Sequence, residues 1–123
     1  MQHIKPLRPA HKEKKRYIVY EADYEPAACS MFTFQQELVR HVQQMLGVFD
    51  SARAGILPVK VDNQTHKGIL RVNHHMVDKV RSCFLLTTHL GRVKARVHTR
   101  TVSGILKKAK TREGFPKENN RKK

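Results

Sequence analysis

The hydrophobic pattern of this chain switches several times between the period of a strand and the period of a helix. Residues 16–22 read RYIVYEA, a run of β-branched and aromatic side chains that predicts a first strand. From Phe34 to Phe49, apolar side chains recur at three- and four-residue steps, which predicts one buried face of an amphipathic helix. Gly47 is expected to end this helix, because glycine readily adopts the left-handed conformation found at helix C-termini.

The remainder of the chain continues the same alternation. Residues 57–61 predict a second strand, and Pro58 places it at a sheet edge because proline cannot donate to a strand ladder. Residues 68–72 predict a third strand, and Asn73 is expected to cap a second helix that buries Val77, Val80 and Phe84. The last strand covers residues 92–100, and a short basic helix is predicted over residues 105–110 after a break at Ser103-Gly104.

The order β-α-β-β-α-β predicts an α+β, ferredoxin-like fold, which is also that of RNA-recognition motifs. Right-handed crossovers then give an antiparallel sheet of order 4-1-3-2 with both helices on one face. This order places the strand with Pro58 at one edge and the strand of residues 92–100 at the other. We expect one domain over residues 16–110, a basic lead over residues 1–15, and a basic, flexible tail over residues 111–123.

Charge narrows the class of partner. The chain has 123 residues, with 25 Lys and Arg against 10 Asp and Glu, a net charge of +15 and a pI near 10.4. A field of this sign attracts polyanions, of which nucleic acids are the most abundant in cells. No run of about 18 apolar residues predicts a membrane span, and no apolar stretch after the first basic residues predicts a secretory signal. We therefore expect a soluble, cytoplasmic protein that binds nucleic acid and no membrane.

The final strand is the most specific feature of the charge pattern. Its basic side chains and His98 alternate with Val93, Ala95 and Val97, so they are expected on one face of the sheet. No acidic residue lies between Arg92 and Thr111, so these cations would repel one another unless a polyanion binds there. Backbone amides near Ser103-Gly104 could also cradle a phosphate. The predicted RNA-binding residues are Lys12, Lys14, Lys15, Arg16, Arg92, Lys94, Arg96, His98, Arg100, Ser103, Gly104, Lys107, Lys108 and Lys110.

Catalysis and metal binding by this chain are not expected. The 8 histidines include the pair His74-His75 but no spacing typical of metal ligands, and the carboxylates are scattered as single residues. Cys29 and Cys83 are far apart, and we interpret them as small apolar side chains. No catalytic residue, metal site or protein-bound cofactor is therefore predicted.

The third strand begins like the signature of an RNA-recognition motif. The aromatic side chains of that signature are replaced here by Ile69, Arg71 and His74. Without aromatic rings, the binding of single-stranded RNA would lose base stacking, its main favourable contribution. Structured RNA, bound through its backbone, is the better expectation.

Three motifs together carry a resemblance to a known family. LRPAHKEKKRYI at residues 7–18, GILRV at residues 68–72 and VSGILKKAK at residues 102–110 resemble, in this order, segments of archaeal ribonuclease P protein component 2, a subunit of the Pop5 type. The chain departs mildly from the last motif, since Ile105 stands where threonine is usual and Leu106 where isoleucine is usual. The resemblance covers roughly residues 5–110.

The resemblance implies a subunit of an enzyme rather than an enzyme by itself. In that family the RNA subunit removes the 5′ leader of precursor tRNA with Mg²⁺ ions at the RNA active site, and the protein stabilises the catalytic domain of the RNA. It further implies ribonuclease P protein component 3 as a partner, a second copy of the chain in a heterotetramer, and precursor tRNA as the substrate of the complex. We expect the basic face to lower the Mg²⁺ that the RNA needs, because bound cations screen repulsion between RNA helices.

Two other functions are compatible with parts of the pattern. A ribosomal or other module that binds structured RNA would share the fold and the charge. A small acylphosphatase-type hydrolase would share the fold but needs a phosphate-cradling loop with Arg and Asn near the first strand, where this chain has the acidic segment 22–25.

Overall fold

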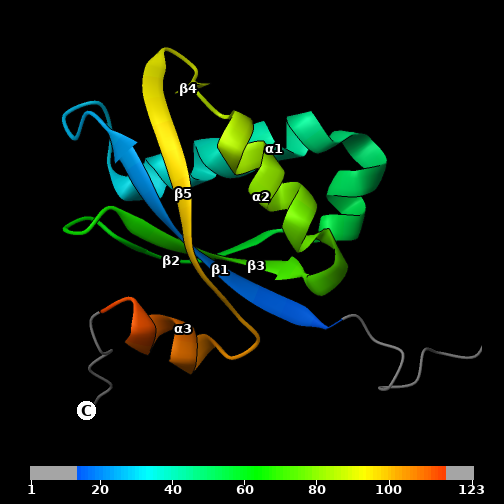
Figure 1. Cartoon of the computed structure of the whole chain (residues 1–123). Coiled ribbons are helices and arrows are strands. Elements are labelled where there is room, and N and C mark those ends of the chain that lie inside the picture. The colour runs from blue at the N-terminus through cyan, green and yellow to red at the C-terminus, as the bar shows by residue number, and fades with distance from the viewer. Residues whose placement is uncertain (1–13, 116–123) are drawn as a thin grey trace, which may run out of the picture.

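A computed structural model of the chain describes residues 14–115 (Figure 1). The basic lead up to residue 13 and the tail from residue 116 lie outside the described residues. The elements are β1 (Lys15–Tyr24), α1 (Met31–Ala54), β2 (Leu57–Asp62), β3 (Lys67–Asn73), the 3₁₀ turn η2 (His74–Met76), α2 (Val77–Leu86), β4 (His89–Leu90), β5 (Val93–Ser103) and α3 (Leu106–Arg112).

The strands form one antiparallel sheet of order β2-β3-β1-β5-β4. The α+β, ferredoxin-like prediction is therefore confirmed, with one strand more than expected. The additional β4 pairs only its two residues with the start of β5, across a turn in which Gly91 has a φ of 61°. Most of β5 consequently remains an edge, as the sequence predicts. The strand β2 forms the other edge, and its register shifts just after Pro58, where a ladder amide is missing.

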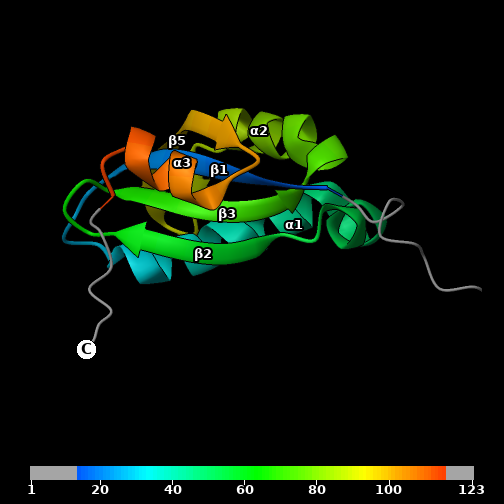
Figure 2. The same ribbon diagram turned by 90° about the horizontal axis from the view of Figure 1, so that it is seen from below.

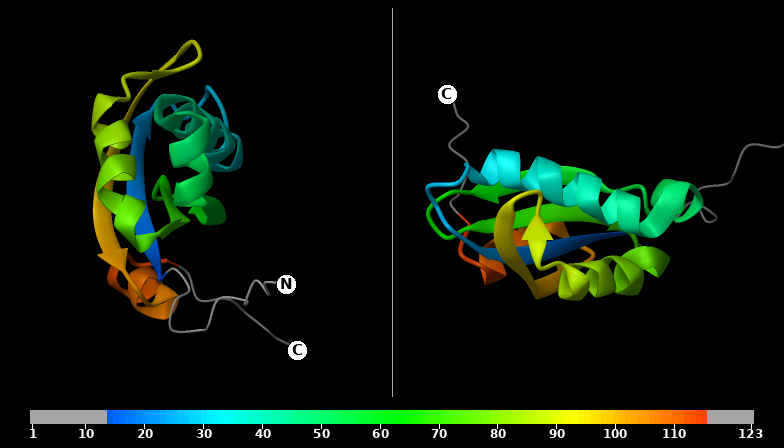
Figure 3. Two further views of the ribbon diagram at one scale, coloured as in Figure 1. Left: turned by 90° about the vertical axis from the view of Figure 1, so that its right-hand side faces the viewer. Right: turned by 90° about the horizontal axis from the view of Figure 1, so that it is seen from above.

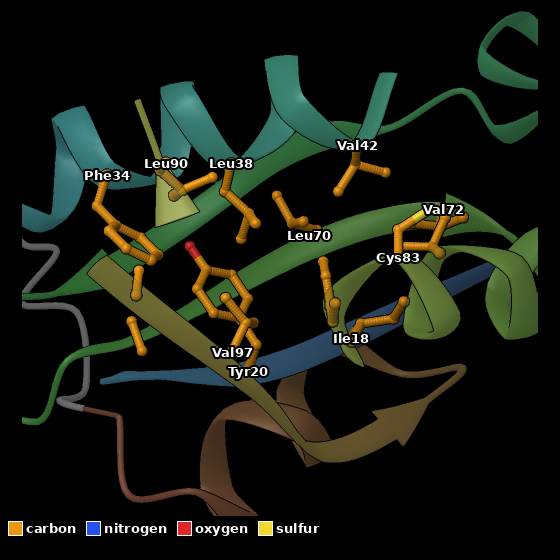
Figure 4. Close-up of a cluster of buried hydrophobic side chains, with 14 of the residues drawn as sticks. Ile18, Tyr20, Phe34, Leu38, Val42, Leu70, Val72, Cys83, Leu90 and Val97 are labelled. Carbon is orange, nitrogen blue, oxygen red and sulfur yellow. The ribbon is translucent and has the colours of Figure 1, made fainter. Parts of the chain in front are cut away.

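The helices α1 and α2 cover one face of the sheet (Figure 3). The core lies between these layers and includes Ile18, Leu38, Leu70 and Val97 (Figure 4). Every second residue of β1 from Ile18 to Tyr24 faces this core, and so do Ala95 and Val97 of β5, which is the alternation predicted for a half-buried strand.

A buried hydrogen bond joins the two layers in the middle of this core. The hydroxyl of Tyr20 donates to Oε1 of Gln35 at 2.6 Å, and burial raises the pKa of the Tyr20 phenol. Both side chains lie over Gly68 of β3, where an added Cβ would come within 2.3 Å of the Tyr20 oxygen. Glycine at this position therefore leaves room for the hydrogen bond between the Tyr20 phenol and the Gln35 amide.

The sequence predicts that the first helix ends at Gly47, but α1 continues beyond this residue. Gly47 interrupts it with φ 82° and ψ 176°, after which the chain resumes a helix to Ala54. The kink rotates the last turns relative to the first, so Phe49, expected in the core, is 86% exposed. A Cβ at Gly47 would meet no atom within 4 Å, so its backbone conformation and not a close contact requires glycine there.

The helix α3 packs on the opposite face of the sheet from α1 and α2 (Figure 2). Ala109 and Phe115 form a second apolar cluster with Val19 of β1 and Ile69 of β3. The sequence predicts a tail from residue 111, but α3 continues to Arg112 and Phe115 is buried. Residues 111–115 therefore belong to the folded part of the chain, and they cover the centre of the face that RNA-recognition motifs leave open.

Glu113 fastens the end of α3 to the sheet. Its carboxylate accepts hydrogen bonds from the Thr101 hydroxyl, from Nζ of Lys67 at 3.3 Å and from Nε of Arg100 at 3.4 Å. Lys67 also donates to the backbone oxygen of Glu113 at 3.1 Å. The Glu113 side chain is only 10% exposed, and these hydrogen bonds, first that of Thr101, lower its pKa below the ordinary value of 4.5. The carboxylate is consequently ionised and paired at neutral pH.

The cysteines agree with their prediction as small apolar side chains. Both are free thiols, Cys83 buried in the core and Cys29 half-buried. Between residues 14 and 115, none of the helices combines the length and apolar character needed to span a membrane.

Replacing Gly68 with alanine is expected to lower the free energy of unfolding by about 1–3 kcal/mol, the usual cost of overpacking a core. The new methyl group would force the Tyr20 hydroxyl away from Gln35. Urea unfolding followed by circular dichroism measures the loss. Gly104→Ala is the matched control, because its nearest contact would be an ordinary 3.4 Å to Arg16. In a double-mutant cycle, Tyr20→Phe should lower the free energy of unfolding by less in the Gly68→Ala protein than in the wild type. Additive losses would show that the methyl group does not displace the Tyr20 hydroxyl.

Replacing Glu113 with glutamine is expected to lower the free energy of unfolding by about 1–2 kcal/mol at pH 7, because charge-assisted hydrogen bonds to Lys67 and Arg100 are lost. Since folding lowers the Glu113 pKa, this contribution is complete above pH 4.5 and disappears as the pH falls through the lowered value. The difference between the two proteins should therefore close in acid. Glu37→Gln, which removes an exposed pair with Arg40, is the control and should change stability by less than about 0.5 kcal/mol. Equal stability of wild type and Glu113→Gln at pH 7 would show that Glu113 does not fasten α3.

Candidate nucleic-acid interface

The basic side chains of β5 lie on the same sheet face as α3. Lys94, Arg96 and His98 are exposed there, while Ala95 and Val97 between them are buried under the helix layer. Arg92 is exposed in the turn between β4 and β5. The prediction that these residues share one face is confirmed for the three strand residues.

The neighbouring strand supplies acidic side chains that the β5 sequence lacks. In the antiparallel register of β1 and β5, Glu21 lies opposite His98 and Asp23 lies opposite Arg96. Residues paired in this way have their side chains on the same face of the sheet. The expectation that the cations of the final strand have no acidic neighbours is therefore wrong. Glu21 and Asp23 cannot be recognised as neighbours from the sequence, because they lie on a strand more than 70 positions away.

Arg100 is the most strongly neutralised of the predicted residues. The register of β1 and β5 shifts between Val19 and Tyr20, which leaves Arg100 as the extra residue of a bulge. Its guanidinium lies 3.6 Å from Oε1 of Glu21 and 3.4 Å from Oε1 of Glu113. Arg100 thus has a structural role in holding α3.

The structure brings two predicted basic clusters to one end of the sheet. The start of β1 runs beside the end of β5, with Tyr17 opposite Ser103. A Cβ at Gly104 would lie 3.4 Å from Nη1 of Arg16, so the start of β1 and the turn before α3 are neighbours. Lys14 and Lys15 are exposed at this end, whereas Lys12 lies outside the described residues.

The basic helix α3 continues the same surface. Lys107 and Lys108 are exposed and Lys110 is half-buried. In the turn before the helix, the Ser103 hydroxyl accepts from the amide of Ile105 at 3.1 Å and donates to its carbonyl at 3.1 Å. The amide of Ile105 is therefore satisfied within the turn, and the phosphate cradle predicted at Ser103-Gly104 stays a prediction.

Taken together, the cations form two groups separated by acidic side chains. One group lies around Arg92 and Lys94, and the other around Lys15, Arg16 and α3; Glu21, Asp23 and Glu113 lie between them. At about 3.4 Å per residue, β5 spans roughly 35 Å. A surface of this length with positive ends suits contacts to phosphates on two separate turns of a folded RNA.

Two residues of this face were not among the predicted ones. Tyr17 and Arg71 lie opposite each other in the register of β1 and β3, beside the N-terminal end of α3. The RNA-recognition signature concerns the third strand, where Arg71 replaces an aromatic residue, and it gives no indication of the neighbouring first strand. The signal that could have identified the pair was the alternation of Tyr17 and Val19 with Ile18 and Tyr20, which assigns Tyr17 to the face without α1 and α2.

The described residues offer no evident place for a metal ion. Between residues 14 and 115, no group of three or more His, Cys, Asp and Glu side chains gathers closely enough to hold one. His74 and His75 contact each other edge to face, with ring centroids 5.6 Å apart.

Comparison with known proteins agrees with the resemblance seen in the sequence. The chain is 30% identical to ribonuclease P protein component 2 of Thermococcus gammatolerans over 109 residues, which cover 85% of this chain and 86% of the relative. It is 29% identical to the protein of the same name from Methanosarcina mazei over 107 residues, which cover 86% and 89%. Residues 16–112, nearly the whole described part, match the sequence model of one family. The chain belongs to the Rpp14/Pop5 family.

Proposed function

We propose that this chain is a protein subunit of ribonuclease P that binds and stabilises the catalytic domain of the RNA subunit. The observation that carries the proposal is the family match over residues 16–112, together with curated relatives that bear the name of ribonuclease P component 2. The cationic surface around β5 and α3 supports it, because a subunit of a ribonucleoprotein needs a face for RNA. In this proposal the complex removes the 5′ leader of precursor tRNA, and the RNA carries the catalysis.

The protein would act through electrostatics. Each Lys or Arg that binds a phosphate releases a condensed counterion, which favours binding and screens repulsion between packed RNA helices. The side chains of Lys94, Lys107 and Lys108 are exposed and make none of the side-chain hydrogen bonds or ion pairs found between residues 14 and 115. They are therefore the strongest candidates for phosphate contacts. The Mg²⁺ ions of the reaction would be bound by the RNA, and a tighter RNA fold would need fewer of them.

The helix layer would serve protein partners. In the proposal these are ribonuclease P protein component 3 and a second copy of this chain. Support comes from large apolar side chains exposed on α1 and α2, among them Val48, Phe49, Leu85 and Leu86. A basic sheet face and a helix layer with exposed apolar groups would let RNA and proteins bind from opposite sides.

The RNA-binding part of the proposal is tested by removing charge from one face only. Replacing Lys94, Lys107 and Lys108 with glutamine should reduce the slope of log affinity against log salt by up to about 3, since each phosphate contact contributes roughly 0.9 on duplex nucleic acid. The variant should also shift cleavage of precursor tRNA by the reconstituted complex to higher Mg²⁺. Fluorescence anisotropy with ribonuclease P RNA measures the first effect and a cleavage assay the second.

A control variant removes the same charge from the helix layer. Arg40, Lys79 and Arg81 lie on α1 and α2, and all three are exposed. Their replacement with glutamine should leave the salt slope and the Mg²⁺ requirement close to those of the wild type. If both triple variants change binding equally, net charge and not the β5–α3 surface attracts the RNA. If the chain purified from cells carries ribosomal RNA, a ribosomal module on the same fold replaces this proposal.

A further inference from the structure

One guanidinium on the α3 face of the sheet lacks an acidic partner. Arg100 and Lys67 are held by Glu113, but Arg71 takes part in none of the ion pairs found between residues 14 and 115. Its Nε is buried, and within the same part of the chain it has no hydrogen-bond partner. A buried donor without an acceptor lowers the stability of the fold, so the Arg71 side chain is an exception among the buried polar groups.

An aromatic ring lies beside this guanidinium. Tyr17 of β1 is the cross-strand partner of Arg71, and Leu57 of β2 is its partner on the other side. These three side chains therefore form one row across the sheet, on the face without α1 and α2. Tyr17 and Arg71 are half-buried and Leu57 is exposed. The row thus presents a flat surface that is part aromatic, part guanidinium and part aliphatic.

The helix α3 leaves this row accessible. It lies across the middle of the face, and the start of β1 and the end of β3 extend beyond it (Figure 2). Tyr17 packs only at the border of the apolar cluster that α3 covers. Gly104 and Ile105, at the entry to α3, are both exposed. The fold therefore covers the centre of the sheet and keeps one end open.

The charge around the row favours a polyanion over an acidic or apolar protein segment. Lys15 is exposed two residues before Tyr17, on the same face, and donates to Oδ1 of Asn73. The nearest acidic residue along β1 is Glu21, four residues from Tyr17 and thus about 13 Å away. RNA supplies both groups that such a surface accepts, because its bases stack on aromatic rings and guanidinium planes and its phosphates pair with Lys and Arg.

We propose that Tyr17 and Arg71 hold one unpaired nucleotide of the bound RNA. The base stacks on the Tyr17 ring and the Arg71 guanidinium, with Leu57 as an apolar border, and Lys15 binds the adjacent phosphate. This inference rests on the proposed RNA binding and adds a preference to it. The β5–α3 surface binds phosphates regardless of base pairing, whereas the Tyr17–Arg71 row distinguishes RNA that exposes a base from RNA that is fully paired.

The test compares two RNA probes on the full chain. One is a short RNA hairpin with an unpaired tail of alternating uridine and adenosine, and the other is the same hairpin without the tail. Wild-type protein should bind the tailed hairpin about tenfold more tightly at equal salt, the ratio expected of one stacked base. Tyr17→Leu and Arg71→Gln should reduce this ratio to about one, while Tyr17→Phe should keep it.

The controls separate stacking from charge and from folding. Lys108→Gln should weaken the binding of both hairpins by the same factor and leave their ratio unchanged. Thermal unfolding of Tyr17→Leu shows that the variant is folded, and the ratio itself is insensitive to a small loss of folded protein. Affinities of the same variants for ribonuclease P RNA should fall for Tyr17→Leu and not for Tyr17→Phe.

Each outcome distinguishes this inference from the function on which it rests. Equal wild-type affinity for the two hairpins, or a ratio that Tyr17→Leu leaves unchanged, overturns the inference while RNA binding stands. Failure of the wild type to bind ribonuclease P RNA overturns the proposed function instead. If Tyr17→Leu keeps every RNA affinity but no longer co-purifies with a protein subunit, the row is a protein contact and the inference is wrong.

Discussion

The arrangement of this molecule depends on the carboxylate of Glu113. It is nine-tenths buried between the Thr101 hydroxyl and the cations of Lys67 and Arg100. Its hydrogen bonds hold the C-terminal end of α3 on the sheet. Without an ionised group at this point, Lys67 and Arg100 would have only Glu21 to share, which lies opposite Lys67 in the register and 3.6 Å from the Arg100 guanidinium. A chain with a net charge of +15 must separate or neutralise its cations in order to fold, and Glu113 does so at the centre of the sheet.

The position of α3 then determines which surfaces are available. Ala109 and Phe115 cover Val19 and Ile69, so the middle of the sheet is closed by apolar contacts. On the face that α3 covers, the exposed cations lie on α3 itself, at the start of β1 and along β5. The apolar side chains that α1 and α2 leave exposed lie in the other layer. Opposite layers of a small domain thus present different chemistry, which is what the proposed function requires.

Family membership and surface chemistry answer different questions about function. The match over residues 16–112 identifies the family, but it assigns no role to any single side chain. The structure distinguishes cations with structural partners, such as Arg100, from cations without them, such as Lys108. This distinction decides which substitutions report on RNA binding and which report on stability. Arg100 would have been a misleading choice for a charge-removal experiment, although it looks equivalent to Arg96 in the sequence.

The order of the longer strands and helices, the edge positions of β2 and β5 and the buried sides of β1 and β5 could be predicted from the sequence. These features follow from local periods, from Pro58 and from the handedness of crossovers, all of which act within or between neighbouring elements. The tertiary structure was needed to show that Gly47 kinks α1 and exposes Phe49, that α3 folds onto the second face, and that Glu21 and Asp23 lie beside the cations of β5. The kink lies in the backbone of Gly47 itself. The other two features depend on contacts between residues distant along the chain, and a local pattern carries no information about which distant side chain lies opposite. The pairing of Tyr17 with Arg71 is of the same kind, since two ordinary positions on separate strands become one surface when the register aligns them.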